Sequence, residues 1–247
     1  MKKVSIYLGF FLSVYLFFVI VQLPAQFIIS QFNLPKNVVL QNVSGSIWQA
    51  EIGQVQTEKL TIHDVTASLS FFSLLTLSPS IDITLGDPMK FGPAGSLTVN
   101  KNGDSFSITN ADITIAANDL LVNAKLPLPV TAYGDFHLTI EKYVLGKPLC
   151  SELSSTIVWP DAQAKALDES VKLGDLKGKL ACEQGAIALI MDNKNNLGLS
   201  YTAYMRNWGK FSGDGFIKPG AKFPPKLKSL LSFLGKPDSQ GRYRLSF

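Results

Sequence analysis

The sequence contains few of the side chains that carry most enzyme chemistry. Its 247 residues include two histidines, His63 and His137, and two cysteines, Cys150 and Cys182. Metal sites need several such ligands at regular spacing, and this chain has no cluster of them. Neither histidine belongs to a nucleophile motif, because His63 lies in a strand-like run and His137 lies on the polar side of another. The sequence therefore predicts no catalytic, cofactor-binding or metal-binding residue, and a protein that is not an enzyme.

Charged residues are scarce as well, at 17% of the chain, whereas apolar residues make up 46%. This balance excludes a disordered protein. The basic residues gather at one end, because from Met205 onward nine lysines and arginines stand against Asp214 and Asp238 alone. The nine are Arg206, Lys210, Lys218, Lys222, Lys226, Lys228, Lys236, Arg242 and Arg244. Such a basic end suits anionic lipid or an acidic partner, or it is a solvated face without a partner.

One long apolar run, Val4–Leu23, contains no charged residue. About 20 residues at roughly 1.5 Å each span the ~30 Å hydrocarbon core of a bilayer. Two lysines precede the run, which predicts a cytoplasmic stub at 1–3, a transmembrane anchor at 4–23 and the remaining chain beyond the membrane. The alternative is a cleaved signal peptide, although a bulky leucine stands where the cleavage site needs a small residue.

The period of the sequence becomes two after the anchor and a connector at 24–35, which we expect to lie at the membrane surface as a short helix. Apolar and polar residues alternate in Ile81–Leu85 and again in Phe136–Ile140. Asn102-Gly103-Asp104 is typical of a tight hairpin turn, because glycine accepts the positive φ that such a turn needs. These patterns predict consecutive antiparallel strands.

Helix signals beyond the connector are few. Lys226–Leu234 predicts a short helix, since it follows two prolines and precedes a glycine. Phe71–Leu77 fits either a helix or a strand. The predicted fold class is mainly β, with a single N-terminal transmembrane helix followed by an elongated, mostly antiparallel β-sheet region.

One spacing occurs in both halves of this region. Trp48 and Trp159 are each followed, at the same distance, by an aspartate, which in the second case is Asp175. This repetition predicts two similar β units, at 36–145 and 146–247. The two tryptophans are either interface anchors or packing residues.

Both cysteines, Cys150 and Cys182, fall in the second unit. Beyond the membrane the chain meets an oxidising compartment, where we expect a disulfide between them. The alternative is a pair of buried free thiols.

Three short motifs resemble a known family. They are Val43-Ser44-Gly45-Ser46-Ile47-Trp48, then Gly174-Asp175-Leu176-Lys177-Gly178 with Ala181-Cys182-Glu183-Gln184-Gly185 after it, and finally the ending Leu234–Tyr243. Together with the initial lysines and the apolar run, they resemble the type II secretion system protein N (general secretion pathway protein N) family. The motif positions are Gly45, Trp48, Gly174, Asp175, Gly178, Cys182 and Gly185.

The resemblance implies a single-pass inner-membrane protein of a Gram-negative bacterium, with its N-terminus in the cytoplasm and its bulk in the periplasm. It implies a part in the export of folded proteins across the outer membrane, through contacts with other type II secretion components of the inner membrane or periplasm. It implies no cofactor, no nucleic acid and no small-molecule substrate.

A second hypothesis is a periplasmic β-groove protein, similar in architecture to AsmA-like and bridge-like lipid-transfer proteins, that handles lipid or maintains the envelope. The placement of the apolar strand faces distinguishes the two hypotheses. A closed core favours a secretion component, whereas an open apolar groove needs an occupant and favours lipid. The residues expected to line such a groove are Leu69, Phe71, Ile83, Leu85, Ile113 and Ile115.

Overall fold

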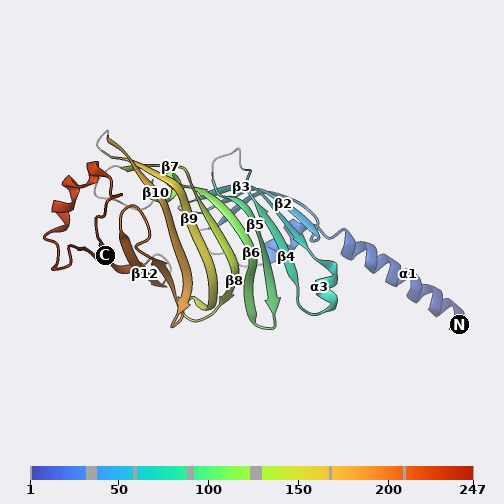
Figure 1. The fold of residues 1–247 in the computed structure, drawn as a ribbon. Coiled ribbons are helices and arrows are strands. Elements are labelled where there is room, and N and C mark those ends of the chain that lie inside the picture. The colour runs from blue at the N-terminus through green and yellow to red at the C-terminus, as the bar shows by residue number, and fades with distance from the viewer. Residues whose placement is uncertain are drawn as a thin grey trace.

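The computed structural model describes residues 2–31, 38–57, 60–87, 92–122, 130–166, 169–207 and 210–246. Most of them belong to strands, which form one large sheet (Figure 1). The strands of its first half are β1 (Val39–Gly45), β2 (Gln49–Gln56), β3 (Thr61–Leu69), β4 (Ser80–Leu85), β5 (Ala94–Asn102), β6 (Ser105–Ala116), β7 (Val130–Tyr133) and β8 (Asp135–Leu145). Those of its second half are β9 (Cys150–Ala166), β10 (Glu169–Glu183), β11 (Ala186–Met191), β12 (Leu199–Asn207), β13 (Lys210–Ile217) and β14 (Tyr243–Ser246).

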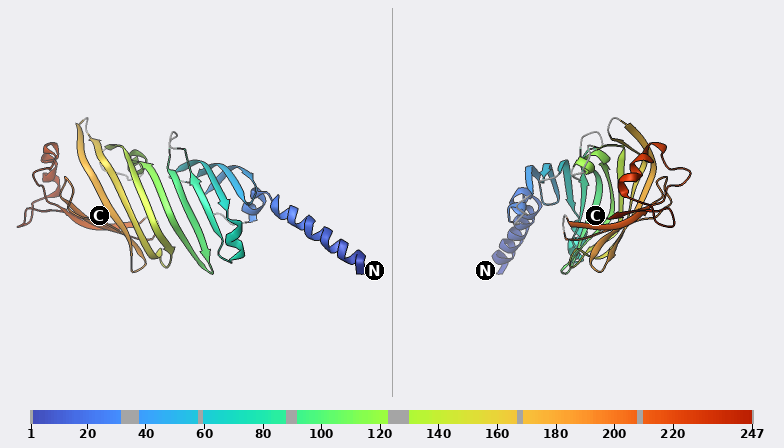
Figure 2. Two further views of the ribbon diagram at one scale, coloured as in Figure 1. Left: turned by 45° about the vertical axis from the view of Figure 1, so that its right-hand side comes forward. Right: turned by 90° about the vertical axis from the view of Figure 1, so that its left-hand side faces the viewer.

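The strands lie in the sheet in the order of the sequence. The order runs from β1 to β6, continues with β8 and ends at β14, while β7 pairs with β9 beside this path. Every strand pair is antiparallel, which confirms the predicted mainly β, mostly antiparallel class. Because each strand adds to the edge left by the previous one, the two ends of the chain lie at opposite ends of the sheet (Figure 2).

Alternation of apolar and polar residues explains how the strands pair. In β8, Phe136, Leu138 and Ile140 are half-buried, while His137 and Thr139 between them are exposed. Side chains at directly opposed positions of an antiparallel pair share a face, so the apolar residues of one strand meet those of the next. The predicted hairpin is confirmed, since Gly103 and Asp104 form the turn between β5 and β6.

The fully buried part of the molecule is small. Its main cluster consists of Ala117, Ala132, Trp159 and Ala162, with Phe136 and two leucines packed against it. Ala117 begins α4 (Ala117–Val122), the helix that contacts β6 and β7. Most other buried apolar residues are also small ones, so the described strands are not wrapped around a large closed core.

Five further described segments are helical. They are α1 (Lys2–Val21), α2 (Ala25–Gln31), α3 (Phe71–Leu75) and a pair of 3₁₀ turns, η1 (Pro225–Leu227) and η2 (Ser229–Leu234). Within the described part of the chain, no helix combines the length and the apolar character of a membrane span. The transmembrane anchor at 4–23 stays a prediction, and the predicted connector is helical at α2 but runs on into residues outside the described ranges.

The short capped helix predicted at Lys226–Leu234 is present as two 3₁₀ turns without side-chain caps. The amide of Leu227 bonds the carbonyl of Pro224 at 3.0 Å, and that of Leu231 bonds Lys228 at 3.3 Å, which is the i−3 spacing of a 3₁₀ turn. Tight 3₁₀ turns are common in short connectors. No side chain caps the start of either turn.

A disulfide joins Cys150, the first residue of β9, to Cys182 near the end of β10. The two Cα atoms are 6.0 Å apart and the bond closes a separation of 32 residues. The sheet continues without a break from β8 to β9, across the predicted boundary between residues 145 and 146. The division of this sheet into units 36–145 and 146–247 stays a prediction.

We predict that Cys150→Ser lowers the free energy of unfolding by about 3–4 kcal/mol, because the unfolded chain loses a constraint on a loop of this length. Urea titration of the variant and the wild type under oxidising conditions measures the change. The reduced wild-type protein is the control and should unfold at the same urea concentration as the variant. Equal midpoints for the variant and the oxidised wild type would contradict the prediction.

Candidate interaction surfaces

One face of the sheet carries a row of apolar and glycine residues, in which Met191 of β11 lies beside Gly178 of β10. Register pairs place each member opposite the next, from β4 across to β9 and β10 and again from β11 to β14. The row consists of Leu85, Gly95, Ile113, Leu138, Ile157, Gly178, Met191, Tyr201, Gly215 and Leu245. We call this side of the sheet the apolar face.

The apolar face is half-buried, not enclosed. Large side chains such as Ile83, Ile113 and Leu138 keep part of their surface in solvent. Figures 1 and 2 show a single curved layer of strands, to which β7 belongs through its pairing with β9. Most large residues of this face are half-buried, so the apolar strip remains partly accessible.

Five residues expected to line an open groove lie on or beside this face. Leu69 is opposite Ile81, which lies on the same side of β4 as Ile83. Gly95 of β5 is opposite Leu85 on one side and Ile113 on the other, so these two residues lie on the same face. Ile115 lies two residues after Ile113 on the same strand, so it points the same way. The sixth residue, Phe71, lies in α3, outside the strands.

The second surface is at the far end of the sheet, where β12, β13 and β14 bring all three arginines of the chain together. The guanidinium of Arg242 lies 4.5 Å from the ring centre of Phe216, and that of Arg206 lies 5.4 Å from the ring centre of Tyr204. Arg244 pairs with Asp214, with its Nε 2.8 Å from a carboxylate oxygen. We call Arg206, Arg242, Arg244, Tyr204 and Phe216 the arginine cluster.

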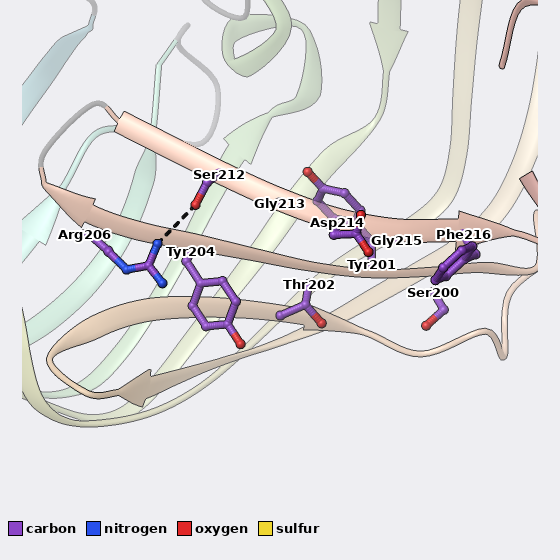
Figure 3. A pocket seen from close by; sticks show the side chains of 10 residues that line it. All are labelled: Ser200, Tyr201, Thr202, Tyr204, Arg206, Ser212, Gly213, Asp214, Gly215 and Phe216. Carbon is purple, nitrogen blue, oxygen red and sulfur yellow. Dashed lines mark hydrogen bonds between the residues drawn. The ribbon is translucent and has the colours of Figure 1, made fainter. Parts of the chain in front are cut away.

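A shallow pocket lies across β12 and β13 within this surface (Figure 3). Ser200, Thr202 and Tyr204 line it from one strand, and Arg206 donates to Ser212 on the other at 3.5 Å. The phenol of Tyr204 donates to Glu183 at 3.0 Å, and this bond raises the pKa of Tyr204 above its ordinary value. Tyr204 is therefore neutral, Arg206 and Arg244 are exposed, and Arg242 is half-buried and pairs with Asp238 at 2.8 Å.

The arrangement is suited to binding carboxylates. The Arg244–Asp214 pair is mostly exposed, and exposed pairs contribute little to stability, so a partner's carboxylate can replace Asp214 at small cost. Arginine and tyrosine are also the residues most enriched at the centres of protein interfaces. The basic composition of this end was predicted from the sequence, but the cluster was not. Its signal was the i, i+2 spacing of Tyr204 with Arg206 and of Arg242 with Arg244, which sets each pair on one side of a strand.

The motif residue Asp175 braces a bend in two neighbouring strands. Its carboxylate accepts the amide of Asp161 at 3.0 Å, across the β9–β10 pair. Asp161 has a φ of 45° and Gly174 has a φ of 75°, and the register of the pair shifts on both sides of Gly174. Asp175 therefore shapes the sheet, since its carboxylate bonds the backbone of the adjacent strand.

Three further motif residues lie around the disulfide. Gly178 is opposite Ile157, and a side chain there would press against Leu189. Gly185 turns the chain between β10 and β11 with a φ of 81°, and its carbonyl accepts the amide of Cys150 at 3.2 Å. Gly185 and Cys182 thus attach the start of β9 to the β10–β11 hairpin, while Gly178 lies against the middle of β9.

The remaining motif residues, Gly45 and Trp48, lie where α1 meets the sheet. Gly45 ends β1 with a φ of 82°. The indole of Trp48 donates to the carbonyl of Ile20 in α1 at 3.3 Å, and its ring lies 5.6 Å from that of Phe71. Of the predicted anchor ends, Val4 lies within α1 and Leu23 just after it.

The two tryptophans of the repeated spacing have different surroundings. Trp159 is 7% exposed, packs 4.8 Å from the ring of Phe136 and donates its indole N–H to Tyr133 at 3.0 Å. Trp48 is only half-buried and contacts α1 and α3. Trp159 is thus a packing residue, while Trp48 lies at the junction of the helix and the sheet.

Sequence comparisons show which known proteins this chain is similar to. A family model described as type II secretion system (T2SS), protein N matches residues 36–246. The chain is 29% identical to the type II secretion system protein N of Aeromonas hydrophila, over 100% of this chain and 98% of that protein. It is 27% identical to the protein of the same name from Vibrio cholerae serotype O1, over 98% and 97% of the two chains. No solved structure matches the chain.

We predict that Gly185→Ala lowers the free energy of unfolding by about 1–3 kcal/mol, because alanine is strained at a positive φ. Its added carbon would also meet the carbonyl oxygen of Lys147. Gly220→Ala is the matched control, since that position has open space around it and should unfold like the wild type. Chemical denaturation of both variants tests the difference, and equal stability of the two would contradict it.

Proposed function

Since the chain belongs to the type II secretion system protein N family and is therefore a component of that machinery, we propose that it is a single-pass inner-membrane protein with a periplasmic sheet. In this proposal it supports the export of folded proteins by contacting other secretion components. It has no catalytic step of its own.

The surface of α1 supports the membrane location. Every side chain from Ile6 to Val21 is exposed, and most of them are large and apolar. A helix that is apolar on all sides is stable when it is surrounded by hydrocarbon or by a protein core. The sheet covers none of the described α1 side chains, so a bilayer is the environment that suits them.

The proposed contact role rests mainly on the distance between the apolar helix α1 and the arginine cluster, which lie at opposite ends of the sheet. The sheet path from β1 to β14 holds thirteen strands, and at a spacing of about 4.8 Å its width is roughly 60 Å. The apolar helix α1 lies at one end and the arginine cluster at the other. Such a molecule is suited to present a basic docking surface at a distance from its anchor.

Deleting the gene tests the secretion role. We predict that a normally exported enzyme accumulates, folded, in the periplasm while the permeability of the envelope stays normal. Unchanged export would contradict the secretion role. A leaky outer membrane with normal export would instead support a function in envelope maintenance.

The arginine cluster can be tested by complementing that deletion. We predict that Arg206→Glu with Arg244→Glu fails to restore export, because reversing central interface charges should weaken partner binding roughly ten-fold or more. Lys101→Glu with Lys142→Glu is the matched control, since these lysines make similar contacts with Phe106 and Glu152 elsewhere on the sheet. If both double variants restore export equally, the arginine cluster is not the docking surface.

One observation favours a second candidate function, the handling of lipid. The apolar face is accessible along the sheet, and apolar surfaces of such extent usually have an occupant. Acyl chains could fill it without polar partners. The names of the relatives give this function no support, so it rests on the uncovered face alone.

A photoreactive residue distinguishes the two faces of the sheet. We predict that benzoylphenylalanine at Ile113 forms adducts with lipid in cells, whereas the same residue at Thr114, the next position of β6, does not. Mass spectrometry of the purified protein detects the adducts. Protein adducts at Ile113 would show that a partner covers the apolar face, and the absence of lipid adducts would contradict the lipid function.

A further inference from the structure

The connection between β3 and β4 presents a group of large apolar side chains to solvent. Five of them lie within seven residues, and no charged residue occurs anywhere in 65–81. Their exposed fractions are 53% for Phe71, 78% for Phe72, 37% for Leu74, 68% for Leu75 and 85% for Leu77. We call α3 and Leu77 together the apolar tip.

The apolar tip has a defined structure. The hydroxyl of Ser73 donates to the carbonyl of Ser70 at 2.6 Å and accepts the amide of Ser80 at 2.9 Å. The amide of Ser70 bonds the carbonyl of Ser80 at 3.0 Å, which closes the base of the connection. Ser70, Ser73 and Ser80 thus hydrogen-bond with one another, while the large apolar side chains of the tip are exposed to solvent.

The backbone at the outermost residue of the tip is strained. Leu77 has a φ of 57°, a conformation that residues other than glycine, asparagine and aspartate rarely adopt. Its amide bonds Leu74 at 3.1 Å and it is the most exposed leucine of the tip. Backbone strain of this kind persists where the surroundings determine it and is often found at functional positions.

The apolar tip lies beside the end of α1. Trp48 connects them, since its indole N–H bonds Ile20 in the last turn of α1 while its ring contacts Phe71 at 5.6 Å. The amide of Ile47 also bonds the carbonyl of Leu23 at 3.0 Å. Figures 1 and 2 show α3 next to the end of α1 where the sheet begins.

We propose that the apolar tip is a second membrane contact, which inserts Phe72, Leu75 and Leu77 into the surface of the bilayer that α1 spans. This inference rests on the proposed membrane location of α1. The tip is at the level where the chain would leave the bilayer, and its freedom from charge suits the boundary of the hydrocarbon. Trp48, with an apolar ring and a polar N–H, has the amphipathic character of residues found at that depth.

Two membrane contacts would do what one helix cannot. A single helix can rotate and tilt in the bilayer, whereas a helix and a nearby tip together restrict the direction in which the sheet leaves the membrane. The arginine cluster would then be held away from the bilayer that carries the anchor. The tip therefore serves to orient the proposed docking surface.

Site-directed spin labels test the contact in the full-length protein. Both native cysteines are in the disulfide, so a label attaches to an introduced cysteine alone. We would label Leu77→Cys and Phe72→Cys in nanodiscs of phosphatidylethanolamine and phosphatidylglycerol. Asp104→Cys, in the exposed β5–β6 turn, is the matched control, and Val14→Cys reports on α1.

We expect the labels at Leu77 and Phe72 to relax several-fold more with oxygen, which concentrates in lipid, than with a water-soluble nickel complex. The label at Asp104 should show the reverse preference. If the label at Leu77 relaxes more with the nickel complex while the label at Val14 relaxes more with oxygen, the apolar tip is not a membrane contact, although the anchor stands. If both labels relax more with the nickel complex, the anchor is overturned as well.

Discussion

The structure depends above all on hydrogen bonding between strands that follow one another in the chain. Backbone N–H and C=O groups at a sheet edge are left to water unless another strand pairs with them, and here the next strand of the sequence does so throughout, except that β8 pairs with β6 while β7 pairs with β9. With few large residues fully buried, the sheet relies on this ladder and on cross-strand contacts along one face. The sequential order also makes the sheet wide, and it sets the two ends of the chain far apart.

The three surfaces of interest all follow from that open design. A single layer leaves the apolar face accessible, where a second sheet would have enclosed it. A sequential layer carries the basic end of the chain away from α1, so that Arg206, Arg242 and Arg244 gather on the last strands. The same order keeps β3 and β4, and with them the apolar tip, beside the helix. This geometry suits the docking role that we propose for the protein.

The residues behind the family resemblance shape the backbone of this sheet. Gly45, Gly174 and Gly185 have positive φ angles, which a residue with a side chain adopts only with strain. Asp175 holds the bend at Gly174 through the Asp161 amide, and Cys182 joins the hairpin of Gly185 to β9. The motifs therefore mark places where the strands bend, turn or are fastened to one another.

The sequence by itself determined the elements whose signals are local. Alternation in Phe136–Ile140 specifies a strand, Asn102-Gly103-Asp104 specifies a hairpin, and a charge-free run specifies the apolar helix, because each pattern reports on neighbours in the chain. Only the tertiary structure decided that the apolar strand faces stay uncovered, that Trp159 is buried while Trp48 bonds α1, and that the ambiguous Phe71–Leu77 is an exposed tip. These outcomes depend on which surfaces meet across the sheet, and pairing between strands, not local propensity, determines that.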